Sequence, residues 1–480
     1  MKRLFLLLLT VLSITASQAQ EFKVTLQAPQ YKSGLAFLTY RFGKNLNIED
    51  SAIVNNGVAI FTAKRRLLPG IYAMVLPGKT HTADFFVDKE QEITIKLDTT
   101  DLLNKKVVTG SKENALFYDY EKNIAVKGAL LENERRLFLA STNKKDSSLH
   151  EANYKKINEE LNVYRDGIIS KHPESMMAVL LNAMKEPKTL DKKLVTHQDS
   201  LDNYYYYRAH YWDGITFMDE RIIRTPFFLP KFERYYREVM TPQPDSIIKE
   251  VDYQLLLARS CPEMYKFLLN WLTDEYINPK YMGQDAIFVH LFDKYHSKGL
   301  TPWLNEKQNE TISRRAYMLM SNLIGAKAAD LDMLDTAGRP TNLYSVNADY
   351  TVVCFWDPNC GHCKEEIPHL DSIYHASWKK HNVKMFAVLS ADSKTDMKPE
   401  WLKYIHQHKI DEWVNVYQTK EMEEKGIAAQ RPSFRQLYDV IMTPTLFLLD
   451  KEKRIIGKKL TWKQLDDLMK VKWSADKKNK

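Results

Sequence analysis

Cysteines are the residues of this chain whose type and spacing allow redox chemistry. Only two residues separate Cys360 from Cys363, so the two sulfurs can meet within one helical turn and close a small disulfide ring. The chain has four cysteines among 480 residues, the others being Cys261 and Cys354. Four are too few for a disulfide scaffold, so the pattern predicts a reversible redox pair, Cys360–Cys363.

The surroundings of this pair predict which sulfur attacks. It follows an apolar run, Tyr350–Phe355, that is typical of a buried strand, and it opens a turn and helix over Pro358–Lys380. The free N–H groups and partial positive charge of a helix N-terminus stabilise a thiolate on the first cysteine, and His362 adds to this effect when protonated. We therefore expect Cys360 to attack and Cys363 to resolve the mixed disulfide.

The same spacing also forms half of a zinc site. Neither Cys261 nor Cys354 has a cysteine or histidine partner at the spacing of a zinc knuckle. We therefore expect no metal and no cofactor. Cys354 lies in the expected strand and is interpreted as inert packing, with a third redox thiol as the alternative, and Cys261 is interpreted as a structural thiol.

A second candidate is the run Met442–Thr445, which stands directly before an apolar strand. Inside a sheet, Pro444 would remove a ladder hydrogen bond. At the first residue of a strand, in cis, it instead leaves the preceding backbone free to pair with an extended polypeptide. Thr443 and Pro444 are therefore candidates for holding a substrate against Cys360, and an ordinary loop proline is the alternative.

Three domains are expected around these motifs. Residues 324–480 alternate strands and helices, which favours an α/β domain with a central mixed sheet flanked by helices. Residues 20–110 have period two and predict a small all-β sandwich, with Gly57 in a hairpin turn. Residues 111–323 have helical periodicity and predict an all-α domain, with helices opening at Pro262 and Asp285. Aromatic residues between 204 and 236 suit core packing or, alternatively, a peptide-binding surface.

The first residues are typical of a secretory signal peptide. Lys2 and Arg3 precede the apolar run Leu4–Ile14, and cleavage is expected after Ala19. The run is shorter than the ~20 residues that span a bilayer. We therefore expect a soluble mature protein in the periplasm or another extracytoplasmic space. The net charge of +8 is spread along the chain, and no basic recognition module is present, so no nucleic-acid partner is expected.

Taken together, these motifs resemble the thioredoxin superfamily, specifically its exported TlpA/ResA-like branch. The resemblance covers residues 324–473 and depends on Val353–Trp356, the Cys-Gly-His-Cys run, Glu366, Pro368 and Thr443-Pro444. It implies a thiol–disulfide oxidoreductase in which Pro444 is the conserved cis proline and Glu366 accepts the proton of Cys363. It also implies substrate contacts at Trp356, Thr443 and Pro444.

The resemblance also implies partners. The substrates would be protein thiols and disulfides, and a membrane protein would be the electron donor. The role would be similar to that of proteins in cytochrome c maturation.

The chain departs from the family pattern at two positions that affect its redox chemistry. Thioredoxin has a buried aspartate where this chain has Cys354, so Glu366 would take over proton transfer. The Gly-His dipeptide resembles protein disulfide isomerase, at about −180 mV, more than thioredoxin, at about −270 mV, whereas the branch more often reduces.

Three other classes of protein share some of these features. A peroxiredoxin needs Pro-x-x-x-Thr-x-x-Cys, but Val353 and Asp357 occupy the proline and threonine positions. A copper-delivery protein would space its cysteines by three residues. The remaining alternative is a binding or scaffold protein of the cell envelope whose cysteine pair is only regulatory.

Overall fold

The computed structural model describes residues 22–79, 81–391 and 396–478. The expected signal peptide lies outside these residues. The chain divides into two compact units, one comprising the residues up to Met240 together with Gln254–Phe267, the other Thr241–Tyr253 together with the residues from Leu268 onward. Within the described ranges, no helix is both long and apolar enough to cross a membrane.

The first unit begins with an all-β domain, as expected. Its eight strands form one sheet in the order β6-β5-β2-β3-β4-β1-β7-β8. Phe85 of β6 and Ile95 of β7, from opposite ends of this order, pack in one core, so the sheet curls back on itself as a sandwich does. The β3–β4 hairpin turns at Asn56 and Gly57, both with positive φ, as predicted. The strands are β1 (Phe22–Gln27), β2 (Ser33–Phe42), β3 (Asn45–Asn55), β4 (Val58–Ala63), β5 (Gly70–Val75), β6 (Thr82–Val87), β7 (Glu92–Lys96) and β8 (Val107–Thr109).

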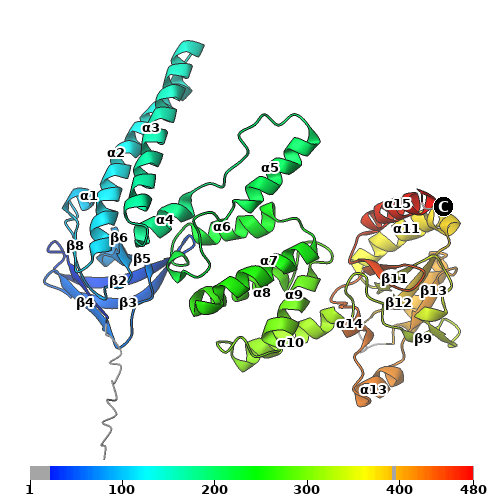
Figure 1. Cartoon of the computed structure of the whole chain (residues 1–480). Helices are drawn as coiled ribbons and strands as arrows, with labels where there is room; N and C mark the ends of the chain where they lie inside the picture. The colour runs from blue at the N-terminus through cyan, green and yellow to red at the C-terminus, as the bar shows by residue number, and fades with distance from the viewer. Residues whose placement is uncertain (1–21, 80, 392–395, 479–480) are drawn as a thin grey trace, which may run out of the picture. The chain divides into compact units, whose positions relative to one another are not determined.

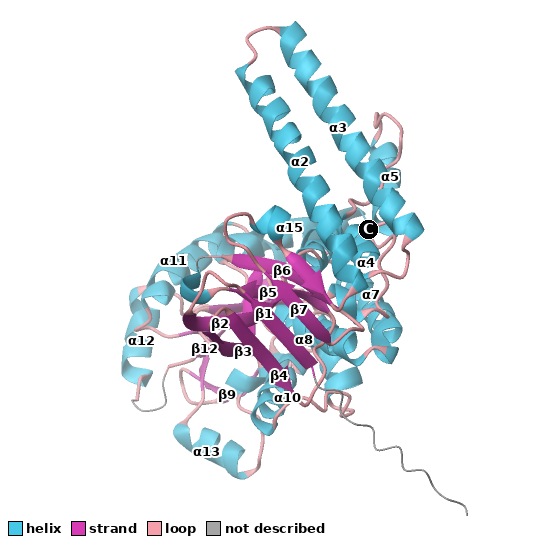
Figure 2. Ribbon diagram, turned by 90° about the vertical axis from the view of Figure 1, so that its left-hand side faces the viewer, coloured by secondary structure: helices cyan, strands magenta, loops and turns pink. Residues whose placement is uncertain are grey.

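Helices make up the rest of the first unit. The two longest, α2 (Lys112–Ala140) and α3 (Lys144–Lys171), run side by side away from the sheet (Figures 1 and 2). Their base packs on β6, where the rings of Phe86 and Phe117 stack with centroids 4.2 Å apart. Half of the aromatic rings between residues 204 and 236 are buried, Tyr211, Phe228 and Tyr235 among them, and these rings pack in the core. The other helices are α1 (Leu102–Lys105), α4 (Met176–Met184), α5 (His197–Ala209) and α6 (Phe228–Arg234).

Four helices precede the C-terminal sheet. Segments of α7 (Pro244–Leu257) and α8 (Pro262–Tyr276) belong to both units, and α9 (Asp285–Leu291) and α10 (Glu306–Met320) belong to the second. Pro262 opens α8 and Asp285 opens α9, as the sequence predicted. A capping box at Asn305 starts α10, because its side chain accepts a hydrogen bond from the Gln308 N–H.

The C-terminal domain has the expected α/β architecture. Its seven strands lie in the order β10-β9-β13-β12-β11-β14-β15, with β11 parallel to β12 and antiparallel to β14. One face is covered by α11, α12 and α15, and the other by the segment before β11 and by α14. The strands are β9 (Asp332–Asp335), β10 (Pro340–Asn342), β11 (Tyr350–Trp356), β12 (Val383–Leu389), β13 (Val414–Tyr417), β14 (Thr445–Leu449) and β15 (Ile455–Lys458). The helices are α11 (Gly361–Ala376), α12 (Lys398–Gln407), α13 (Lys420–Ala428), α14 (Phe434–Leu437) and α15 (Trp462–Lys478).

Candidate redox site

A tight turn carries the chain from the central strand into the helix of the cysteine pair. β11 ends at Trp356, and the Asp357 carboxylate then accepts a hydrogen bond from the Asn359 N–H (2.8 Å), while its backbone carbonyl accepts one from the Cys360 N–H (3.1 Å). Cys360 is the N-cap residue of α11, with φ −73° and ψ 126°. The first cysteine therefore stands where the helix leaves its backbone N–H groups free.

The two sulfurs lie in different environments. Cys360 is half-buried, whereas Cys363 is 1% exposed, and both are free thiols in the structure. Burial acts to raise the pKa of Cys360, but hydrogen bonds with Thr443, Cys363 and the His362 backbone outweigh it, so the pKa lies below the ordinary value. Burial raises the pKa of Cys363 to about 12. The geometry thus favours one ionised outer sulfur and one protonated inner sulfur.

The proline loop lies directly against the outer sulfur. Sγ of Cys360 is 3.3 Å from the backbone carbonyl oxygen of Thr443, to which the thiol can donate. The peptide bond between Thr443 and Pro444 is cis, as the sequence predicted. Ile441 and Met442 are 69% and 73% exposed, and they form an apolar surface beside the cysteine.

The remaining predicted residues lie below or beside this surface. Trp356 is fully buried and packs on Tyr404, with ring centroids 5.1 Å apart, so the structure does not bring it to the surface where a substrate would bind. Glu366 is half-buried on α11, and His362 is exposed. Burial raises the pKa of Cys354 well above its ordinary value, and the charges of Cys363 and Glu366 act in the same direction. Cys354 therefore lies close to both groups, beneath the reactive pair.

Two cavities that the sequence did not indicate open in the C-terminal domain. One, of about 950 Å³, is lined by Met442, Thr443 and Met397 among other residues. Met397 is in turn 3.7 Å (Sδ) from the side-chain nitrogen of Asn359, next to Cys360. Two of the lining residues, Thr443 and Met397, thus contact Cys360 or its neighbour Asn359. No periodic pattern marks its lining residues, which come from several separate strands, helices and loops.

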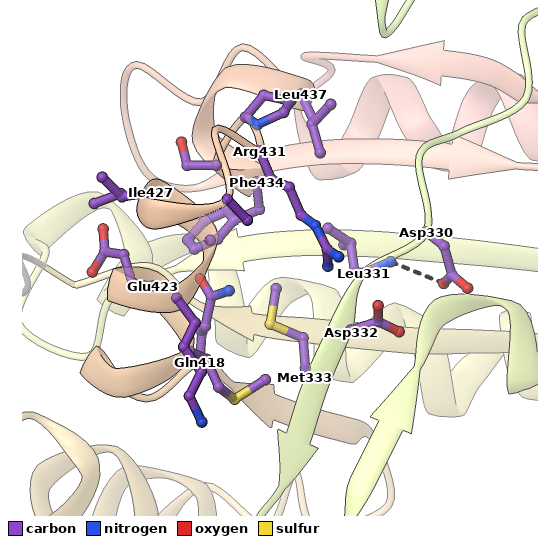
Figure 3. Close-up of a pocket in the computed structure, with 16 residues that line it drawn as sticks. Asp330, Leu331, Asp332, Met333, Gln418, Glu423, Ile427, Arg431, Phe434 and Leu437 are labelled. Carbon is purple, nitrogen blue, oxygen red and sulfur yellow. Dashed lines mark hydrogen bonds between the residues drawn. The ribbon is translucent and has the colours of Figure 1, made fainter.

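Figure 3 shows the second cavity, of about 610 Å³, beside α13. The side chain of Arg431 runs toward Leu331 and Asp332 on the opposite wall. Neither Cys360 nor the proline loop lines this cavity. In the part of the chain that the structure describes, no group of three or more His, Cys, Asp or Glu side chains is placed to hold a metal ion.

Two parts of the chain match known protein families. Residues 324–458 match the AhpC/TSA family, and residues 22–117 match a domain of unknown function, DUF4369. A search of curated proteins gave no match. Among solved structures, the chain is similar to a domain of a possible thiol-disulfide isomerase from Cytophaga hutchinsonii, with 36% identity over 33% of this chain and 97% of that chain and a TM-score of 0.27.

Two further solved structures come from Bacteroides. A thioredoxin-like protein from Bacteroides caccae is 20% identical, over 60% of this chain and 99% of that chain, with a TM-score of 0.44. The thioredoxin domain of a thiol-disulfide oxidoreductase from Bacteroides vulgatus is 23% identical, over 30% of this chain and 96% of that chain, with a TM-score of 0.25.

Proposed function

The chain belongs, through its C-terminal domain, to the thioredoxin superfamily, and from that premise we propose that it exchanges thiols and disulfides on protein substrates through Cys360 and Cys363. The single observation that carries this proposal is the contrast between the two sulfurs. Cys360 is partly exposed with a lowered pKa, and Cys363 is buried with a raised one. An enzyme of this class needs one sulfur that attacks the substrate and a second that stays protonated until it resolves the mixed disulfide.

The reaction has two steps. In the first, the Cys360 thiolate attacks one sulfur of a substrate disulfide, the S–S bond breaks, and a substrate thiolate leaves. In the second, Cys363 gives up its proton and attacks Sγ of Cys360, which releases the second substrate thiolate and forms the Cys360–Cys363 disulfide. Two electrons pass from the enzyme to the substrate, and in the reverse direction the oxidised pair takes two electrons from a substrate dithiol.

Two neighbouring groups support these steps. Glu366 stands one turn after Cys363 on α11 and is the proposed acceptor of the Cys363 proton. The proline loop is proposed to hold an extended substrate segment, because its exposed residues Ile441 and Met442 adjoin Thr443, whose carbonyl faces Cys360. His362 is exposed beside the pair and is proposed to support the Cys360 thiolate when protonated.

We further propose that the enzyme works in the periplasm or another extracytoplasmic space, on exported proteins. The support is the charged start and apolar run of residues 1–19. A membrane protein carrying a reactive thiol pair would supply electrons if the enzyme reduces. The reduction potential of the Cys360–Cys363 couple, measured against glutathione buffers, decides the direction, since about −270 mV favours reduction and about −180 mV favours oxidation or isomerisation.

Trapping tests the proposal. Cys363→Ser leaves the attacking sulfur without its resolving partner, so incubation with insulin, a disulfide-bonded model protein, is expected to accumulate a mixed disulfide that dithiothreitol cleaves. Cys261→Ser is the matched control, because Cys261 lies in the other unit, and it should accumulate none. If Cys363→Ser traps no insulin chain, or if Cys360→Ser/Cys363→Ser traps as much, the proposal is wrong.

A further inference from the structure

The loop that carries Pro444 begins at a buried carboxylate. After α14 ends at Leu437, the chain passes through Asp439, which has a φ of 50° and is fully buried, and reaches Thr443 and Pro444. One carboxylate oxygen of Asp439 accepts a hydrogen bond from Arg315 Nη1 at 2.6 Å, and the other contacts Lys459 Nζ. A buried carboxylate needs such partners, so the turn at Asp439 is held by both cations.

The first of these cations comes from the helical segment before the domain. Arg315 lies on α10, which contacts α14 (Figure 1), and its Nε donates to the carbonyl oxygen of Ile277 at 3.2 Å. Arg315 is separated from Asp439 by 124 positions and lies outside residues 324–458, which match the family. The contact is therefore a property of this chain's helical segment joined to its redox domain.

A second contact holds the same loop. Asn322, just after α10 and fully buried, donates through its side-chain amide to the carbonyl oxygen of Leu437 at 3.0 Å. Its own side-chain and backbone oxygens accept hydrogen bonds from Lys458 Nζ at 2.9 and 2.8 Å, and Lys458 also contacts Asp285 of α9. At the far end of the loop, the Lys459 N–H donates to Leu446 O at 2.7 Å. Both ends of the loop are thus attached to one group of polar residues, which includes Asn322, Lys458 and Lys459.

We propose that Arg315 and Asn322 are positioning residues for disulfide exchange. Acting through Asp439 and Leu437, they fix the Ile441–Pro444 loop against Cys360, so the helical segment sets how tightly the redox domain holds an extended polypeptide. The kinetic part of this inference rests on the proposed function. The structural part, a loop held from α10, is independent of it.

Arg315→Met is the direct test, and Arg314→Met is its matched control, because Arg314 is the exposed neighbour on the same helix. We expect Arg315→Met to raise the KM for a disulfide-bonded protein substrate at least about tenfold with a smaller change in kcat, since a misplacement of about 1 Å can cost about 100-fold. Arg314→Met should stay within about twofold of the parent. Equal KM values for the two variants would overturn the inference.

Hydrogen exchange gives a readout that does not depend on activity. Amides of residues 440–443 should exchange faster in Arg315→Met, and also in Asn322→Ala should the first variant not fold, while those of α11 stay protected. In an Asp439→Asn background, Arg315→Met should add little further change, because its effect passes through Asp439. Unchanged hydrogen exchange in the loop of both variants would overturn the inference even if the wild type proved active. If the wild type proved inactive but the loop exchanged faster in Arg315→Met, only the proposed function would be overturned.

Discussion

The two halves of the redox site are built in different ways. The half around Cys360 is local, because the turn and helix start are held by hydrogen bonds among Asp357, Asn359, Cys360 and Lys364. The half around Thr443 depends on residues far away in the chain, such as Arg315, 124 positions from its partner Asp439. Local geometry therefore supplies the reactive sulfur, and long-range packing supplies the surface that faces it.

The largest effect should come from breaking the local half. Cys360→Ser removes the attacking sulfur, so we expect complete loss of disulfide exchange, measured by reduction of a fluorescent disulfide peptide. The surrounding hydrogen bonds involve backbone groups that serine retains, so thermal unfolding should be almost unchanged. Residual exchange above that of Cys360→Ser/Cys363→Ser would contradict the assignment.

Breaking the long-range half should reduce stability strongly. Lys458 and Asp285 are 6% and 4% exposed, and removing one partner of such a pair costs about 3–5 kcal/mol. We expect Lys458→Met to lower the free energy of unfolding by that amount in urea titrations, and Lys458→Met/Asp285→Leu to recover most of it. Lys451→Met, at an exposed position in the β14–β15 turn, is the control and should have almost no effect.

The pH dependence of cysteine alkylation separates the contribution of the helix N-terminus from that of the proline loop. A thiol reacts as its thiolate, so the rate at Cys360 should rise with pH to a midpoint below the ordinary value of 9.0. Cys363, with a pKa of about 12, should stay almost unreactive at pH 7. Arg315→Met should raise the midpoint for Cys360 only part of the way toward 9.0, because the variant leaves the N-terminus of α11 unchanged. A midpoint at or above 9.0 in the wild type would refute the local half of the comparison.

The smallest effect is expected at the third thiol of the domain. Cys354 is fully buried and its pKa is well above the usual value, so it should take no part in exchange. Cys354→Ala should keep exchange rates within about twofold and cost about 1 kcal/mol of stability. A tenfold loss of exchange in a folded variant would instead assign Cys354 a role in the chemistry.

Most of the fold could be predicted because its elements bury regular apolar patterns. The predicted run Tyr350–Phe355 lies within β11, and α11 begins within the predicted turn and helix. The helices α13 and α14 were not predicted. Neither contains a buried residue, so no periodic apolar pattern marks them, and their capping residues, such as Ser433, resemble ordinary loop residues.

The candidate site could be predicted where its residues lie close together in the sequence. The spacing of Cys360 and Cys363 and the cis proline at Pro444 could be found in the sequence. The buried position of Trp356 could not, because an apolar residue at the end of a strand can face either the core or the surface. The contact between Arg315 and Asp439 has no sequence pattern, since it depends on how two separate segments pack.

The paired helices α2 and α3 have a consequence for how this protein can vary. From residue 125 to residue 160 no side chain on the two helices is buried, and none belongs to the apolar cluster by which α2 and α3 pack on β5 and β6. Matched turns can therefore be added to or deleted from both helices without repacking the β-domain. The length of the paired helices α2 and α3 can therefore vary while the sheet on which they pack keeps its structure.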